Sequence, residues 1–318
     1  MKLSTKIAST SLLALSLLGS ACKKDEAQPT PPPPAPEAKK EAPPPPPPPA
    51  PEKPKFTEVP GFQAPESVLY VADGDYYLVS NVNGEPNKTD DNGYISKVGA
   101  DWKMVDEKFI DGAKPDVKLD APKGSGIRGD KLYVADITVV RVFDLKTGKQ
   151  DKDIAIKGAT FLNDIAIDGD TVYVSDSGVG GDFKPNGTGA VYSLDKANKI
   201  TKLAGGDDLG SPNGLLVVDG KLWINTLVGK SIYRLDGGKK VDSVDLPTGM
   251  LDGFAALPDG RIAVSSWEGK VIYAGKPGAA FDKLFEDVEA PADLIVDAKH
   301  NVLVVPQMSK NVLRVYPL

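Results

Sequence analysis

The chain has 318 residues, a formal net charge of −6, 28 prolines, 32 glycines, one cysteine and one histidine. The lone cysteine excludes a disulfide framework and any multi-cysteine zinc or iron–sulfur site, and the lone histidine excludes a multi-histidine metal centre. A Ser-His-Asp or Cys-His enzyme would have only His300 to use. The acidic balance argues against a nucleic-acid partner.

Residues 1–21 have the pattern of a secretory signal. Lys2 and Lys6 form a basic start, the apolar stretch 7–18 is too short to span a bilayer, and small residues at 19–21 precede Cys22. The segment resembles a bacterial lipoprotein signal, although glycine replaces the usual leucine three residues before the cysteine. We therefore expect a lipid on Cys22 and a place on the extracytoplasmic face of the bacterial cell envelope, with the outer membrane as one option. The alternative is ordinary cleavage near residue 21 and a free thiol.

Residues 22–54 predict a proline-rich tether. Fifteen of the 28 prolines lie between Pro29 and Pro54, with an unbroken run from Pro43 to Pro49 and almost nothing apolar between them. Such a composition cannot build a core and favours an extended, disordered spacer with polyproline II character.

Residues 55–318 predict an all-β domain, because one pattern recurs six times. Each copy has a short apolar strand, a turn that is usually Asp-Gly and a second apolar strand, as in Thr171–Asp176. The second residues of the copies are 66, 123, 163, 213, 252 and 292, which are 57, 40, 50, 39 and 40 residues apart. Repeats of this length are typical of propeller blades, so we predict a six-bladed β-propeller.

The last repeat is too short for four strands. It has room for three, near 294–296, 302–305 and 312–316, and the apolar stretch Phe56–Phe62 precedes the first repeat. We expect this stretch to supply the fourth strand, because joining the two ends of the chain in one blade removes an open sheet edge.

The starts of the first strands indicate a metal site. In a propeller the first strand of each blade lies nearest the axis, so equivalent side chains from all blades converge there. The six residues at this position are Glu66, Lys123, Asn163, Asn213, Asp252 and Ala292. Two carboxylates and two amides are hard oxygen ligands, which predicts a divalent cation, with Ca²⁺ the expected one. The alternative is that each Asn or Asp only makes local turn contacts.

The order Glu66, Asn163-Asp164, Pro212-Asn213-Gly214 and Asp252-Gly253 on successive blades resembles the regucalcin/gluconolactonase family, to which the paraoxonases are related. The resemblance implies a cation held by Glu66, Asn163, Asn213 and Asp252, with Asp252 as general base in the hydrolysis of a lactone or ester. The chain departs from these families at three positions. Phe161 replaces an arginine that contacts sugar acids, Lys123 replaces a paraoxonase histidine, and Gly253 replaces the asparagine that follows the fifth-blade aspartate in paraoxonases.

Lys123 and Phe161 are the predicted substrate-binding residues, and each has alternatives. Lys123 is either a lysine at the channel rim, an ammonium that attracts a substrate carboxylate or oxyanion, or a replacement for the cation that pairs with Glu66 and Asp252. Phe161 either packs in the core or lines an apolar lactone pocket.

Two functions remain open from sequence. The first is a membrane-tethered, metal-dependent hydrolase of a small lactone or ester, expected to be a monomer. The second is a non-catalytic propeller that binds an envelope ligand, with a structural cation in its central channel. The fold cannot choose between them, because propellers host many functions.

Overall fold

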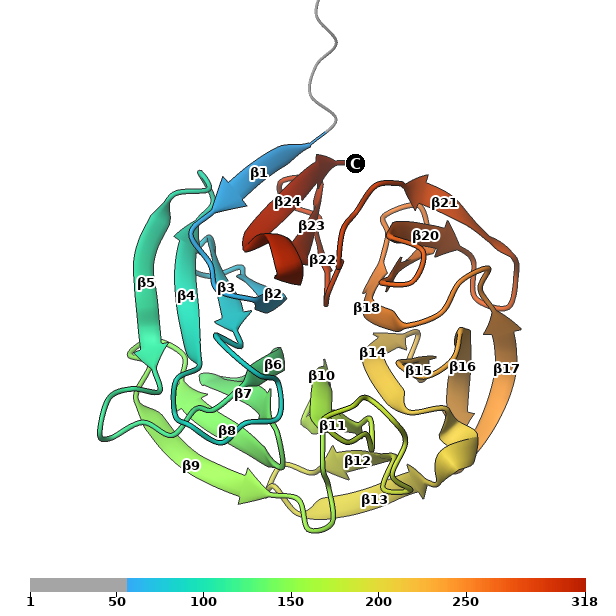
Figure 1. Cartoon of the computed structure of the whole chain (residues 1–318), viewed down its shortest axis with the longest axis horizontal. Coiled ribbons are helices and arrows are strands. Elements are labelled where there is room, and N and C mark those ends of the chain that lie inside the picture. The colour runs from blue at the N-terminus through green and yellow to red at the C-terminus, as the bar shows by residue number, and fades with distance from the viewer. Residues whose placement is uncertain (1–55) are drawn as a thin grey trace, which may run out of the picture. The chain divides into compact units, whose positions relative to one another are not determined.

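The computed structural model describes residues 56–318, which form an all-β, six-bladed propeller. Six four-stranded sheets surround a central axis, and Figure 1 shows the first strand of each sheet facing that axis. The predicted fold class is confirmed for this part of the chain. The predicted signal peptide, the tether at 22–54 and Cys22 lie outside the described residues.

Neighbouring strands run antiparallel within each sheet, and the sheets are here called blades 1 to 6 in chain order. Blade 1 contains β2 (Pro65–Val71), β3 (Tyr76–Asn81), β4 (Tyr94–Gly99) and β5 (Met104–Asp111). Blade 2 contains β6 (Pro122–Arg128), β7 (Lys131–Asp136), β8 (Val139–Asp144) and β9 (Gln150–Ala155). Blade 3 contains β10 (Leu162–Asp168), β11 (Thr171–Asp176), β12 (Ala190–Leu194) and β13 (Ile200–Gly205). Blade 4 contains β14 (Pro212–Val218), β15 (Lys221–Thr226), β16 (Ser231–Asp236) and β17 (Lys239–Asp245). Blade 5 contains β18 (Leu251–Ala256), β19 (Ile262–Ser266), β20 (Val271–Gly275) and β21 (Phe281–Phe285). Blade 6 contains β22 (Ile295–Asp297), β23 (Val302–Gln307), β24 (Val312–Pro317) and β1 (Thr57–Pro60).

The only helices in the described part are two three-residue 3-10 helices, Asp207–Leu209 and Met308–Lys310. Within residues 56–318 no helix is both long and apolar enough to cross a lipid bilayer.

The Asp-Gly turns form hairpins, as the sequence predicts. Between β14 and β15, Val218 pairs with Lys221, so the loop is Asp219-Gly220, and both residues have positive φ (51° and 66°). Two-residue hairpin loops with positive φ at both positions match the twist of the flanking strands, and Asp-Gly is a preferred sequence for them.

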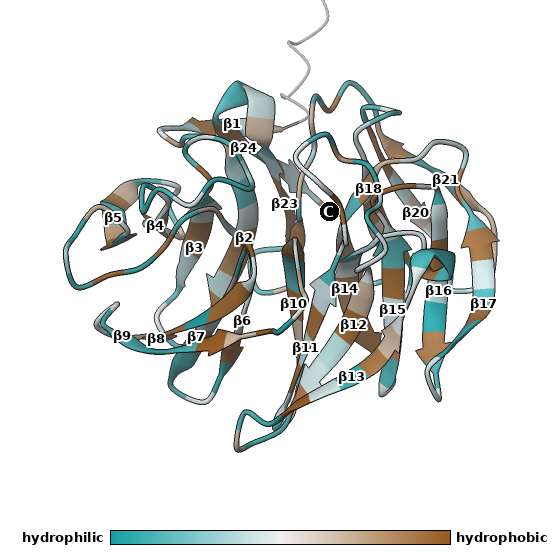
Figure 2. Cartoon of the chain, turned by 60° about the horizontal axis from the view of Figure 1, so that its bottom comes forward, coloured by the Kyte–Doolittle hydropathy of each residue, from teal (hydrophilic) through white to brown (hydrophobic). Residues whose placement is uncertain are grey.

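The core consists of the interfaces between neighbouring blades. Six apolar clusters lie between successive blade pairs, and each takes residues from two blades; one example is Tyr133 and Val142 of blade 2 with Val172 and Tyr192 of blade 3. Because both faces of each sheet are covered, the middle strands are apolar on both faces. Figure 2 shows brown, hydrophobic segments along the strands and mainly teal or pale connecting loops.

The ring closes in blade 6 through the N-terminal strand. β1 pairs with β24, with Val59 opposite Leu313, and completes the sheet β1-β24-β23-β22. Figure 1 shows β1 in blue beside β24 in red. The predicted fourth strand is therefore confirmed.

We expect this closure to contribute measurably to stability. Val59 is buried in the cluster between blades 6 and 1, whereas Thr57 on the same strand is exposed. Val59→Ala should lower the free energy of unfolding by about 2 kcal/mol, because it removes buried methyl groups. Thr57→Ala is the matched control and should change it by less than about 0.5 kcal/mol. Equal unfolding curves for both variants in guanidinium would contradict this role of β1.

Candidate functional site

In five of the six blades, a bulge at the start of the first strand turns one polar side chain toward the axis. In blades 1 to 5 the pairing of first and second strands shifts register directly after the first residue. The unpaired residue that follows is Glu66, Lys123, Asn163, Asn213 or Asp252. Bulges free a residue from the ladder and re-aim its side chain, which explains why these five side chains meet.

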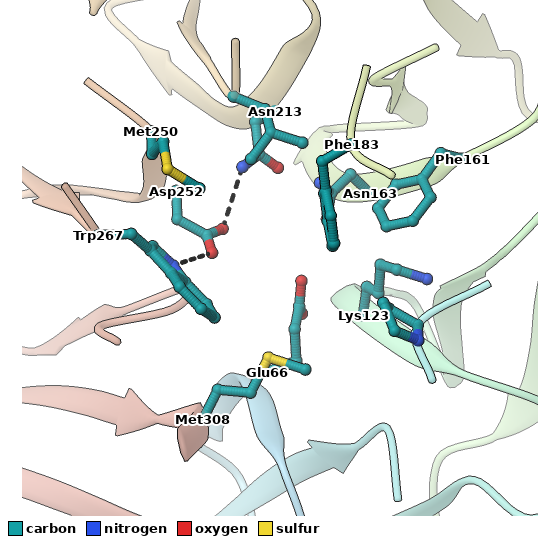
Figure 3. Close-up of a pocket in the computed structure, with 12 residues that line it drawn as sticks. Glu66, Lys123, Phe161, Asn163, Phe183, Asn213, Met250, Asp252, Trp267 and Met308 are labelled. Carbon is teal, nitrogen blue, oxygen red and sulfur yellow. Dashed lines mark hydrogen bonds between the residues drawn. The ribbon is translucent and has the colours of Figure 1, made fainter. Parts of the chain in front are cut away.

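The five side chains line one pocket of about 120 Å³. All five are buried, and Figure 3 shows the carboxyl of Glu66 pointing into the space between Asp252, Asn163 and Lys123. Ala292, the sixth equivalent residue, is fully buried and does not line the pocket. The other walls are apolar or aromatic: Pro86, Phe161, Phe183, Leu227, Met250, Trp267 and Met308.

Both amides have their nitrogen atoms engaged, so that their oxygens are the free ends. Asn163 Nδ2 donates to Ser177 Oγ (3.1 Å), and Ser177 Oγ donates to the carbonyl of Pro212. Asn213 Nδ2 donates to the carbonyl of Leu251 (2.8 Å) and to Asp252 Oδ1 (3.2 Å). Because a carbonyl and a carboxylate only accept hydrogen bonds, the orientation of Asn213 is fixed.

Two oxygens at the site are buried without any hydrogen-bond partner in the described part of the chain. They are Glu66 Oε2 and Asn213 Oδ1, both from the predicted ligand set. A buried polar atom without a partner is costly and calls for an explanation such as an ion or a water. The donor set therefore fits a hard cation such as Ca²⁺.

Asp252 is held by donors on both oxygens. Trp267 Nε1 donates to Oδ2 (2.9 Å) and Asn213 Nδ2 to Oδ1, as the dashed lines in Figure 3 show. Burial is the main cause that raises the pKa of Asp252 to about 7; the charge of Asp164 adds to it, and the two N–H donors oppose it. Trp267 was not predicted as a site residue, because it lies in the loop after β19, outside the repeated pattern.

Further carboxyl groups lie around the same channel. Burial raises the pKa of Glu66 well above its usual range, and the charges of Asp252 and Asp293 add to this effect while Lys123 opposes it. The pKa of Asp293 is also raised, by burial and by the charges of Asp164 and Asp252. Like charges that share a low-dielectric site favour protonation or a bound cation.

Lys123 is buried, which contradicts the prediction of a rim lysine. Its side chain is only 1% exposed, its Nζ donates to the carbonyl of Ala121 (3.0 Å), and Nζ lies 4.5 Å from the ring centre of Phe161. No carboxylate of residues 56–318 forms a salt bridge with Lys123; Glu66, Asp136 and Asp120 act on it through their charges alone. Burial lowers its pKa, and the charge of Glu66 opposes that shift. Within residues 56–318, the carbonyl of Ala121 is the one hydrogen-bond acceptor of the Lys123 ammonium, so this geometry does not support pairing with Glu66 and Asp252.

Phe161 both packs in the core and lines the pocket, which were predicted as alternatives. It packs with Val179 and Leu227 in a small apolar cluster, and it lines the pocket. Its backbone N–H donates to Asp176 Oδ1 (2.9 Å), which also accepts from Gly178 (3.0 Å). Asp176 thereby fixes the two segments that flank the pocket in blade 3.

His300 does not line the pocket. It lies in the β22–β23 turn, where Nδ1 is 2.6 Å from Asp297 Oδ2. In residues 56–318 no three His, Cys, Asp or Glu side chains are grouped as metal ligands, so any cation at the pocket needs the amide oxygens as well.

Comparison with solved structures shows the same fold in several enzymes. A virginiamycin B lyase from Staphylococcus aureus is 13% identical, with a TM-score of 0.59, over 83% of this chain and 99% of that one. A gluconolactonase from Xanthomonas campestris is 15% identical, with a TM-score of 0.55, over 84% and 99%. A histidine-to-alanine variant of the lyase, solved with quinupristin, is described as catalytically inactive. The structural similarity to gluconolactonase-type propellers, expected from the motifs, is thus confirmed at the level of the fold.

No model of a known protein family matches the chain, and no curated protein matches its sequence.

We expect Asp252 to make the metal-free protein less stable as the pH rises. Between about pH 4 and pH 7 the folded protein keeps a proton on Asp252 that the unfolded chain has released. The folded state therefore loses stability across this window, and Asp252→Asn removes this contribution. The free energy of unfolding of Asp252→Asn minus that of the wild type should therefore be larger at pH 7.5 than at pH 5. Guanidinium unfolding with chelator at the two pH values measures this difference.

Asp282→Asn is the control, because Asp282 is exposed on the outer strand β21. A stability difference between Asp252→Asn and the wild type that is the same at both pH values would refute the assignment.

Proposed function

We propose that the protein is a divalent-cation-dependent hydrolase of a lactone or ester. The observation that carries this proposal is the pair of buried oxygens without partners, Glu66 Oε2 and Asn213 Oδ1, next to Asp252 and Asn163. These four residues would hold the cation, with Ca²⁺ the expected ion. When bound, such a cation supplies Lewis-acid polarisation of a carbonyl and a lower pKa for a bound water.

The residues around the cation have separate roles in the proposed reaction. Asp252 accepts a proton from the attacking water, and Trp267 and Asn213 hold its carboxylate in place. Lys123 donates its remaining N–H groups to the oxygen on which negative charge develops, from a position where it does not have to reorganise. Phe161 supports the apolar part of the substrate and the lysine together.

Solved structures with this fold include a lyase and a gluconolactonase, and the residues of the pocket favour the hydrolytic class. A lyase with this fold is inactivated by loss of a histidine, whereas no histidine lines the present pocket. A gluconolactonase with this fold hydrolyses a lactone, according to its name. The carboxylate and amide set of the present pocket fits the hydrolytic class better.

The second candidate is a non-catalytic binding module whose cation only stabilises the channel. It is favoured by the mainly apolar walls and by Phe161 at the position where a sugar-binding arginine would be expected. For either candidate we propose lipid anchoring at Cys22 in the bacterial cell envelope, with residues 22–54 as the spacer. We also propose that the protein acts as a monomer.

Calcium should stabilise the wild type and not Glu66→Gln. A ligand at one hundred times its dissociation constant adds about 2.7 kcal/mol to the free energy of unfolding. Glu66→Gln removes one charged oxygen ligand and should abolish most of this gain, whereas Asp282→Asn should keep it. Thermal unfolding with calcium and with chelator measures the effect. An equal calcium shift in Glu66→Gln and the wild type would place the ion elsewhere.

Hydrolysis should depend on both Asp252 and Lys123. On a panel of lactones and aryl esters with calcium, Asp252→Asn should lower kcat by about 100-fold or more, because a general base is lost. Lys123→Met should lower kcat by about 100-fold. Lys123→Met should also bind calcium at least as tightly, because a positive charge near Glu66 is removed.

These two readouts separate the candidate functions. Calcium binding without turnover of any substrate would support the non-catalytic binding module and not the hydrolase. Turnover that survives chelation and both Glu66→Gln and Asp252→Asn overturns the proposed site.

A further inference from the structure

Exposed apolar side chains surround the entrance of the pocket. Phe183, Val228 and Met250 are 44%, 38% and 43% exposed, which is unusual for such residues in this ring. They come from three separate connections, namely the loop between β11 and β12, the loop after β15 and the residue before β18. Together with Leu227 they form what we call the mouth patch.

The mouth patch continues the pocket outward. A second hollow of about 610 Å³ is lined by the four mouth-patch residues together with Gly229, Lys230, Gly249 and Glu268. Phe183, Leu227 and Met250 line both this hollow and the pocket that contains Glu66 and Asp252. An apolar surface therefore leads from the oxygen cluster to solvent, and Figure 3 shows Phe183 and Met250 at the pocket.

Two of these residues have backbone conformations with positive φ. Phe183 and Met250 have φ values of 58° and 53°, a region that residues with a Cβ rarely adopt. Hydrogen bonds maintain them: Phe183 N–H donates to the carbonyl of Gly180 (2.9 Å), and Met250 N–H donates to that of Gly229 (3.0 Å). The two turns therefore hold apolar side chains in the open, and exposed apolar surface at a pocket is typical of a binding site.

We propose that the mouth patch binds the alkyl or acyl chain of an amphiphilic lactone or ester whose carbonyl lies beside Glu66, Asp252 and Lys123. The proposal rests on the proposed function and names its substrate class. We assign a chain of the substrate to the mouth patch because Phe183, Leu227 and Met250 line both the hollow and the pocket where the carbonyl would lie.

The chemistry of the walls disfavours a polyhydroxylated substrate at this place. The patch offers phenyl, thioether and branched alkyl groups, and Glu268, at its edge, already accepts the N–H of Gly249 (2.5 Å). Of residues 56–318, Lys230 and Glu268 are the only charged side chains that line the hollow, so most hydroxyl groups of a sugar would lose water there without gaining partners. An alkyl chain loses nothing and removes apolar surface from water.

The first test uses the calcium-loaded full chain and a series of straight-chain aryl esters from acetyl to decanoyl. Each buried methylene is worth about 0.8 kcal/mol, so kcat/KM should rise about three- to fourfold per methylene until the hollow is filled. Val228→Ser and Phe183→Ser should reduce the ratio of octanoyl to acetyl kcat/KM by about tenfold. Val105→Ser should keep that ratio, because Val105 is 62% exposed on β5, the outermost strand of blade 1.

The second test measures binding without turnover. N-octyl-pyrrolidinone, a lactam that resists hydrolysis, should quench tryptophan fluorescence through Trp267 and bind at least tenfold more weakly to Val228→Ser. Lactam binding without hydrolysis of any ester supports the chain site and overturns the proposed hydrolase.

Hydrolysis with a flat chain-length profile overturns the chain site and leaves the hydrolase standing. Self-association that Val228→Ser abolishes, combined with a flat profile, also overturns the chain site and assigns the patch to a second copy of the chain.

Discussion

Carboxyl groups buried around a single axis repel one another, and the properties of the site follow from how that repulsion is balanced. Glu66, Asp252 and Asp293 each have a raised pKa because burial and neighbouring carboxylates disfavour their charged forms. Protons, Lys123 or a cation can supply the compensating charge. Lys123 is buried nearby but bonds to a backbone carbonyl, so it compensates only from a distance. A cation between Glu66 and Asp252 would remove the repulsion and satisfy the two oxygens without partners.

The fold places these groups together through one local device that is used in five blades. A bulge after the first residue of the inner strand frees the next side chain to point at the axis, and the closed ring fixes where the five side chains meet. The second strands hold the entering segments, as Asp136 does for the N–H of Ala121 (2.8 Å) and Asp176 for that of Phe161. The oxygens are thus preorganised before any ligand arrives, which is the condition for electrostatic catalysis.

The repeat pattern was sufficient to predict the ring and the positions that face its axis, because both depend on periodic local signals. The Asp-Gly turns set the hairpins, and the equal phase of Glu66, Asn163, Asn213 and Asp252 brought them to one pocket. The burial of Lys123 was not predictable, because it depends on Phe161 from the next blade. Trp267, Phe183 and Met250 were missed because they lie in connections that do not share the period of the strands. The directions of the two amides depend on Ser177 and Leu251, which only the folded ring brings near.

The proposed function depends on Glu66, Asn163, Asn213 and Asp252 forming one cation site. The most direct measurement is the anomalous scattering of a crystal of the protein grown with Mn²⁺, an ion that also prefers oxygen ligands. We predict one strong anomalous peak within about 2.5 Å of Glu66 Oε2 and Asn213 Oδ1. A peak elsewhere, or none at the pocket while the protein is saturated with Mn²⁺, would contradict the account.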